Sequence, residues 1–143
     1  MTLTDSHAFS IEAIVGEPVE VGETPAGFRR VIPILGGTVS DGLSGEVLPG
    51  GADWNTVRRD GSVHLWARYE FRTADGVVVS VINEAFHDAE ATVILTRPTF
   101  EVGAAGPAWL AAGFFVGVLT GAAVPGRVRI DVRQLTVEPP VSR

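Results

Sequence analysis

The run Gly50-Gly51-Ala52-Asp53-Trp54 places a carboxylate and a large aromatic side chain directly after two glycines. Glycine lets the backbone bend sharply, so we expect the run to turn Asp53 and Trp54 toward the interior. A carboxylate beside an apolar wall has a raised pKa and is suited to act as a general base. Asp53 is therefore the first candidate for acid–base chemistry, with Trp54 as a pocket wall. In the structural alternative, Asp53 caps a turn and Trp54 packs in the core.

A second group of polar side chains lies in Ser62 to Arg72, which alternates as a strand does. One face holds Val63, Leu65, Ala67, Tyr69 and Phe71, and the other holds His64, Trp66, Arg68, Glu70 and Arg72. If the polar face is inside, Arg68 is a buried cation that needs an acidic partner, with Asp53 and Glu84 as candidates. Arg68 would then stabilise a developing oxyanion or bind a substrate carboxylate. If the apolar face is inside, Arg68 is solvated and Tyr69 faces the interior, and alternation alone leaves both possibilities open.

Other polar and aromatic residues complete the candidate site. Asn83 is expected to orient water or substrate beside the base. Glu84-x-x-His87 together with His64 resembles a set of three metal ligands. Because the chain has only three histidines, one of them His7 near the N-terminus, we predict no metal and no other cofactor, and His87 is interpreted as a loop residue. The predicted substrate-binding residues are Trp54, Trp66, Tyr69, His64, Glu84 and Trp109.

Many short strands are predicted to position these residues, since 17 glycines and 9 prolines suit strands joined by turns. Strands are expected over residues 11–21, 28–35, 62–72, 77–83, 91–96 and 128–137, with a helical turn near 107–112 and one or two strands around it. Gly36-Gly37-Thr38 is expected to kink the chain, and Asp41-Gly42 and Ala74-Asp75-Gly76 to form turns. About eight strands favour one all-β domain over residues 1–143, a closed antiparallel barrel with room for one small ligand.

The composition narrows the possible partners and location. The net charge is −6 and the pairs Arg29-Arg30 and Arg58-Arg59 are isolated, so we interpret them as solvated surface and predict no nucleic-acid partner. The absence of cysteine excludes disulfides, thiolate nucleophiles and cysteine-ligated zinc. The first twenty residues lack a basic start followed by a long apolar stretch, so we predict a cytoplasmic protein.

The uncharged segment from Val102 to Gly126 is long enough to cross a membrane. Its glycines Gly113, Gly117 and Gly121 also have the spacing of membrane-helix dimers. Its six glycines and two prolines, however, suit a helix poorly. We therefore predict a buried strand bounded by turns, and no membrane partner.

Motifs along nearly the whole chain resemble those of one protein family. They are Pro33-Ile34-Leu35-Gly36-Gly37-Thr38, the run Gly45 to Gly51, Ala52-Asp53-Trp54, Arg59-Asp60-Gly61, Ala67-Arg68-Tyr69, Thr73, Asp75-Gly76, Arg97-Pro98-x-Phe100-Glu101 and Trp109-Leu110. In this order they resemble the domain-of-unknown-function 3237 family of small bacterial proteins. The resemblance implies a calycin-like β-barrel, commonly a homodimer, and says little about activity. This chain departs from the family pattern at Ala111, where the family often has Asn, and at Asn83-Glu84-Ala85, where it often has Gly.

Three functions are compatible with these features. The leading hypothesis is a cofactor-independent enzyme that acts on an apolar small molecule by acid–base chemistry, of lyase, isomerase, cyclase, hydratase or epoxide-hydrolysis type. Asp53 would be the base or water activator, Arg68 the electrostatic stabiliser and Asn83 the orienting group. The second hypothesis is a lipocalin-like binding protein without turnover, and the third is a structural subunit whose barrel core is fully packed.

Overall fold

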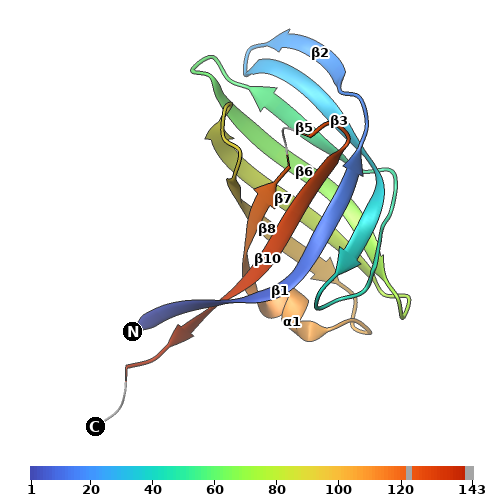
Figure 1. Ribbon diagram of the computed structural model, residues 1–143, viewed down its shortest axis with the longest axis vertical. Coiled ribbons are helices and arrows are strands. Elements are labelled where there is room, and N and C mark those ends of the chain that lie inside the picture. Colours follow the sequence, from blue (N-terminus) through green and yellow to red (C-terminus); the bar gives the residue numbers. More distant parts are fainter. Residues whose placement is uncertain (122–123, 141–143) are drawn as a thin grey trace.

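The computed structural model describes residues 1–121 and 124–140, and within them the chain is all-β apart from one short helix (Figure 1). Its elements are β1 (Thr2–Val15), β2 (Val19–Thr24), β3 (Gly27–Ser40), β4 (Gly45–Val47), β5 (Ala52–Val57), β6 (Ser62–Thr73), β7 (Val78–Asp88), β8 (Ile94–Val102), α1 (Ala108–Ala112), β9 (Phe114–Thr120) and β10 (Arg127–Glu138).

The strands form a closed antiparallel barrel, as predicted, with eight strands and two extra ones. β1 closes it by pairing with β10 along one edge and with β3 along the other. Gly37 marks the closure: its φ is +138°, and a Cβ there would lie 2.0 Å from the carbonyl oxygen of Glu12. Only glycine allows β3 to come this close to β1. The expected kink at Gly36–Thr38 does not end the strand, since β3 continues to Ser40. Both glycines do have positive φ, and the register with β1 shifts beside them, between Ile14 and Val15.

The strand with the clearest alternation was predicted almost to the residue. The expected strand 62–72 is β6, and Ala74-Asp75-Gly76 joins it to β7. The expected strand 11–21 is wrong in its bounds: it covers the end of β1, a break at residues 16–18 and the start of β2. Pro18 lies in that break, and proline cannot donate to a β-ladder.

The uncharged segment between Val102 and Gly126 contains the end of β8, the helix α1 and the strand β9. The predicted helical turn and buried strand are thus confirmed. In the described part of the chain, no helix has the length and apolar character needed to cross a membrane.

One end of the barrel is filled by aromatic side chains. Phe9, Phe71, Phe100 and Phe115 meet there, with ring centroids 5.4 Å apart for Phe9–Phe100 and 5.2 Å for Phe100–Phe115. α1 lies across this end (Figure 1), and its Leu110 is buried against the cluster. The aromatic side chains thus fill this end of the barrel.

Candidate functional site

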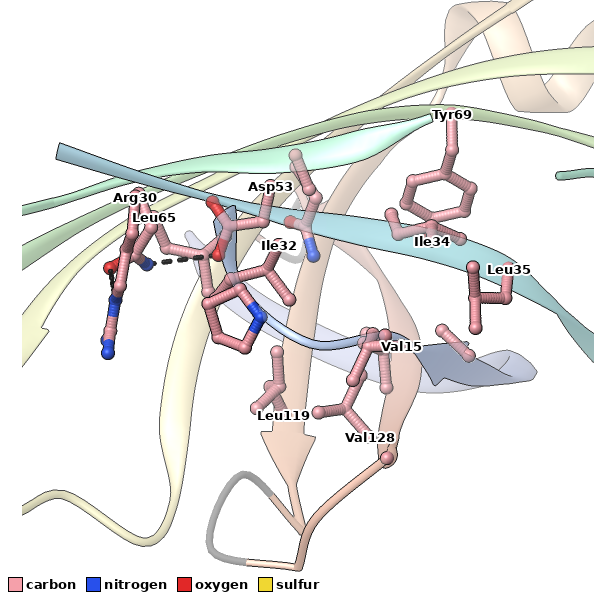
Figure 2. Close-up of a pocket in the computed structure, with 18 of the residues that line it drawn as sticks. Val15, Arg30, Ile32, Ile34, Leu35, Asp53, Leu65, Tyr69, Leu119 and Val128 are labelled. Carbon is pink, nitrogen blue, oxygen red and sulfur yellow. Dashed lines mark hydrogen bonds between the residues drawn. The ribbon is translucent and has the colours of Figure 1, made fainter. Parts of the chain in front are cut away.

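The other half of the barrel encloses a cavity of about 640 Å³ (Figure 2). This volume falls within the usual range for small-molecule sites, so the hypothesis of a fully packed core is wrong. The cavity reaches residues 16–18 and 124–126, which lie in the connections before β2 and before β10. Its apolar wall comes mainly from Val15, Ile34, Leu119, Val128 and Ile130. Its polar groups come from β3, β5, β6 and β7 and, at the connection before β2, from Glu17.

Asp53 on β5 faces the cavity, whereas Trp54 faces outward. The expectation that both turn inward is wrong, because successive residues of a strand point to opposite faces. Asp53 Oδ1 accepts a hydrogen bond of 2.9 Å from the Trp66 backbone N–H, and Oδ2 accepts one of 3.0 Å from Asn55 Nδ2. The carboxylate therefore has a fixed orientation at the cavity wall.

Burial raises the pKa of Asp53 above its ordinary value of 3.8. Four effects oppose this rise: the hydrogen bonds from Trp66 and Asn55, and the charges of Arg30 and His64. Since the burial effect is the largest, this carboxylate is a stronger proton acceptor than one in water. It therefore has the electrostatic character expected of a general base.

Arg30 and Asn55 support Asp53 from the side. Arg30 on β3 pairs with Asn55 on β5, and its Nε donates a 2.9 Å hydrogen bond to Asn55 Oδ1. With its oxygen toward a cation and its nitrogen toward a carboxylate, the Asn55 amide has one favourable orientation. The interpretation of Arg30 as solvated surface is wrong, and Asn55 was overlooked. Its position two residues after Asp53 was the available signal, because residues i and i+2 share a strand face.

Asn83 and Tyr69 also line the cavity. Each residue is only 3% exposed, yet Asn83 Oδ1 and the Tyr69 hydroxyl have no hydrogen-bond partner among residues 1–121 and 124–140. Burial raises the pKa of Tyr69, so its hydroxyl keeps its proton at neutral pH. Asn83 thus lines the same cavity as the candidate base, and its role there stays a prediction.

Arg68 lies on the outer face of β6 and is exposed to solvent, so its predicted place beside Asp53 is wrong. The same alternation places Tyr69 inside and His64 and Trp66 outside. Of the two interpretations of this strand, the one with the apolar face inside is confirmed. The interior cation near Asp53 is Arg30, which reaches the cavity from β3.

The remaining predicted substrate-binding residues lie away from the cavity. On the outer face, Glu84 Oε2 is 2.7 Å from His64 Nε2, and Trp54 contacts Trp66 with ring centroids 5.8 Å apart. Trp109 on α1 contacts Phe9 and Phe115 at the closed end. Among the six predicted substrate-binding residues, only Tyr69 lines the cavity.

The possible metal ligands Glu84 and His87 lie on opposite faces of β7, because they are three positions apart in a strand. Glu84 pairs with His64 outside, and His87 lines the cavity. The interpretation of His87 as a loop residue is wrong, since β7 extends to Asp88. Within residues 1–121 and 124–140, His, Asp and Glu side chains form no group of three that could hold a metal ion.

The two departures from the family pattern lie in different places. Asn83 is in the cavity wall, whereas Ala111 is an exposed residue of α1. Only the departure at Asn83 can therefore affect what the cavity binds.

Comparisons with known proteins agree with this fold. The model of the family described as "Protein of unknown function (DUF3237)" matches residues 4–135. A UPF0311 protein of Bradyrhizobium diazoefficiens is 37% identical, over 94% of this chain and 97% of its own length. The crystal structure of a conserved protein of unknown function from Rhodopseudomonas palustris has a TM-score of 0.85 at 39% identity, covering 95% of this chain and 99% of that one.

A more distant structural neighbour is described as an enzyme from Penicillium herquei. It has a TM-score of 0.76 at 18% identity and covers 95% of this chain and 96% of its own. At that identity the similarity shows the shared barrel fold alone. The chain belongs to the DUF3237 family, as its motifs predicted.

Proposed function

We propose that the protein is a cofactor-independent enzyme in which Asp53 acts as a general base on an apolar small molecule bound in the barrel. The main support is the Asp53 carboxylate itself, which faces a largely apolar cavity of about 640 Å³ and has a pKa raised by burial. A buried carboxylate is costly to maintain, and a structural cap at a turn would not need a position on a cavity wall.

The surrounding residues suit this role. The Trp66 N–H and the Asn55 amide orient the two carboxylate oxygens, so the base is held ready for one direction of proton transfer. Arg30 fixes Asn55 and keeps the pKa of Asp53 from rising further. Arg30 is therefore a positioning residue, and it takes over the electrostatic part first assigned to Arg68.

The reactions that fit need only proton transfer. Asp53 removes a proton from a substrate hydroxyl, from an acidic carbon or from a water molecule, and later returns it. Isomerisation, cyclisation, elimination, hydration and epoxide opening all meet this condition. That a neighbour with the same fold is described as an enzyme agrees with such a use of the barrel.

A binding protein without turnover is the second candidate, and the mainly apolar wall of the cavity favours it. A carrier needs a complementary cavity but no base, so it tolerates removal of the carboxylate charge. Asp53→Asn therefore separates the two functions.

The test is conversion of a panel of apolar epoxides, enones and hydroxy compounds, followed by liquid chromatography and mass spectrometry. For any compound converted, Asp53→Asn should lower kcat by roughly 10²- to 10⁴-fold, the usual contribution of a general base. The matched control is Arg68→Gln on the outer face, which should retain full activity. Full activity in Asp53→Asn, with the fold intact by circular dichroism, would contradict the assignment. Tight binding of panel compounds without conversion would favour the carrier.

A further inference from the structure

Two buried polar atoms in the cavity wall have no hydrogen-bond partner in the part of the chain that the structure describes. They are Asn83 Oδ1 and the Tyr69 hydroxyl oxygen, on residues that are each 3% exposed. An unpaired polar group in a folded interior is unfavourable, and such groups are rare in native structures. Both residues line the cavity, although the two atoms are themselves buried. A rotation of either side chain would therefore let a molecule bound in the cavity supply the missing hydrogen bond.

The strand register places both residues close to Asp53. Ala67 on β6 stands opposite Asp53 on β5 and opposite Asn83 on β7, so the three form one row across neighbouring strands. Directly opposed residues point to the same side of an antiparallel sheet. The small side chain of Ala67 leaves open space between the carboxylate and the amide.

Tyr69 is the next inward-facing residue of β6 after Ala67, which makes it a diagonal neighbour of Asn83. Diagonal neighbours lie about 7–8 Å apart, within reach of a long aromatic side chain. Figure 2 shows Asp53 and Tyr69 extending into the cavity from the same wall, with Leu119 and Val128 opposite them. The base and the unpaired groups therefore share one wall.

We propose that Asn83 and Tyr69 form a subsite for a hydroxyl group of an otherwise apolar substrate, adjacent to Asp53. This inference rests on the proposed function, because it names the substrate class of the same cavity. A hydroxyl group donates one hydrogen bond and accepts two. It can therefore donate to Asn83 Oδ1 and accept from the Tyr69 O–H.

Other functional groups meet these requirements less well. A ketone or ether oxygen has no proton to donate to Asn83 Oδ1, and an amide N–H accepts nothing from Tyr69. A substrate carboxylate would be repelled by the charge of Asp53. The opposite wall consists of apolar side chains such as Val15, Leu119 and Val128. It therefore favours a molecule whose remaining part is apolar.

The subsite also identifies the proton that Asp53 removes. The one hydrogen of the bound hydroxyl turns from Asn83 Oδ1 toward the Asp53 carboxylate. Its O–H bond then breaks, a new O–H bond forms on the carboxylate, and the electron pair stays on the substrate oxygen. The resulting alkoxide or phenolate accepts a hydrogen bond from the Tyr69 hydroxyl, which stabilises the developing charge. No oxidant, reductant or second substrate is required.

The test compares two probes of almost the same shape, 4-phenylphenol and its methyl ether 4-methoxybiphenyl, by isothermal titration calorimetry on the full chain. The wild-type protein should bind the phenol about tenfold more tightly, the size of one hydrogen bond. Asn83→Leu and Tyr69→Phe should each reduce this preference toward one, while the outer-face control Arg68→Gln keeps it. Equal binding of the two probes by the wild type, no binding of either, or an unchanged preference in both cavity variants would overturn the subsite.

A second measurement guards against misfolded variants. Because the Tyr69 hydroxyl has no partner to lose, Tyr69→Phe should leave the ligand-free melting temperature unchanged or raise it. A clear fall would show that the hydroxyl is already bonded within the protein, against the proposal. Asp53→Asn, in turn, tests the proposed function alone. If the wild type prefers the phenol but converts no hydroxy compound, the enzyme assignment fails and the subsite stands; if Asp53→Asn abolishes turnover while the preference is absent, only the subsite fails.

Discussion

The two faces of β5, β6 and β7 use similar residue types for different purposes. On the outer face, charged and aromatic side chains contact one another. His64 Nε2 lies 2.7 Å from Glu84 Oε2, and the His64 ring stacks on Phe86 with centroids 4.4 Å apart. The guanidinium carbon of Arg58 lies 4.8 Å from the centroid of the Phe86 ring. On the inner face, by contrast, Asn83 and Tyr69 have unpaired polar atoms beside a carboxylate of raised pKa.

This difference distinguishes the outer residues, which stabilise the barrel, from the inner residues, which we assign to the proposed site. Polar groups on the outer face are satisfied by neighbours or by solvent, so they need no ligand. The inner groups are held in an unfavourable state that a bound molecule relieves, as is common at functional sites. Substitution of Ala67, which faces inward on β6, should therefore lower the ligand affinity. Substitution of its neighbour Arg68, which faces outward, should leave the affinity unchanged.

The largest effect is expected for Ala67→Leu. The added side chain would fill the space between Asp53 and Asn83, so the affinity for 4-phenylphenol should fall by roughly 100-fold or more, the cost of displacing a well-fitted ligand. Calorimetric titration measures this directly. Arg68→Leu, one residue along the strand, should leave the affinity unchanged; a similar loss in both variants would break the comparison of the two faces.

Arg30→Met should have the next largest effect. It removes the hydrogen bond that fixes Asn55 and the positive charge that lowers the pKa of Asp53. We expect kcat/KM to fall roughly tenfold at neutral pH, the size of one charge-assisted hydrogen bond, and the acid limb of the pH–rate profile to move to higher pH. Arg29→Met is the matched control, because Arg29 bonds to Thr56 instead and lies by the outer groove. An unmoved acid limb in Arg30→Met would show that Arg30 does not influence the base.

Stability should depend on pH through Asp53 in a defined direction. Its folded-state pKa lies above the unfolded value of 3.8, so between these two values the folded protein binds more protons than the unfolded chain. The contribution of Asp53 to stability therefore falls as pH rises through this window, by at most about 1.4 kcal/mol per pH unit, and is then constant. Urea unfolding of the wild type and Asp53→Asn from pH 3.5 upward should show the wild type losing stability relative to the variant.

Asp60 provides a control of opposite sign. Hydrogen bonds from Ser62 lower its pKa, so its contribution is present above the unfolded value of 3.8 and is lost as pH falls through the folded-state pKa. The wild type should therefore gain stability relative to Asp60→Asn as pH rises. The same direction of change for both variants would contradict the assigned burial of Asp53.

The smallest effect is expected for Glu84→Gln on the outer face. The partly exposed pair with His64 should contribute about 1 kcal/mol or less to the free energy of unfolding, and both activity and probe affinity should stay at wild-type values. Chemical denaturation and the calorimetric assay together measure this. A loss of probe affinity would mean that the outer face takes part in binding.

Much of the fold could be predicted from local sequence. The alternation of Ser62 to Arg72 predicted both the extent of β6 and the two sets of residues that share a face, because the side-chain period of a strand is two. The Asp75-Gly76 turn predicted the hairpin that follows, since its geometry depends on neighbouring residues alone. The motifs from Pro33 to Leu110 identified the family and hence the barrel.

The site could be predicted only in part, and the reason is physical. Alternation divides a strand into two faces but does not say which face is inside, so either Arg68 or Tyr69 could have faced the interior. The closure of the sheet through β1 decided between them. Asn55 shares the face of Asp53 by local spacing, yet Arg30 reaches this pair from a strand 25 residues away only through the register of β3 and β5. The sequence by itself thus determined the strands and the candidate base, because these depend on neighbouring residues. The tertiary structure alone decided which side chains surround that base, because strand pairing joins distant parts of the chain.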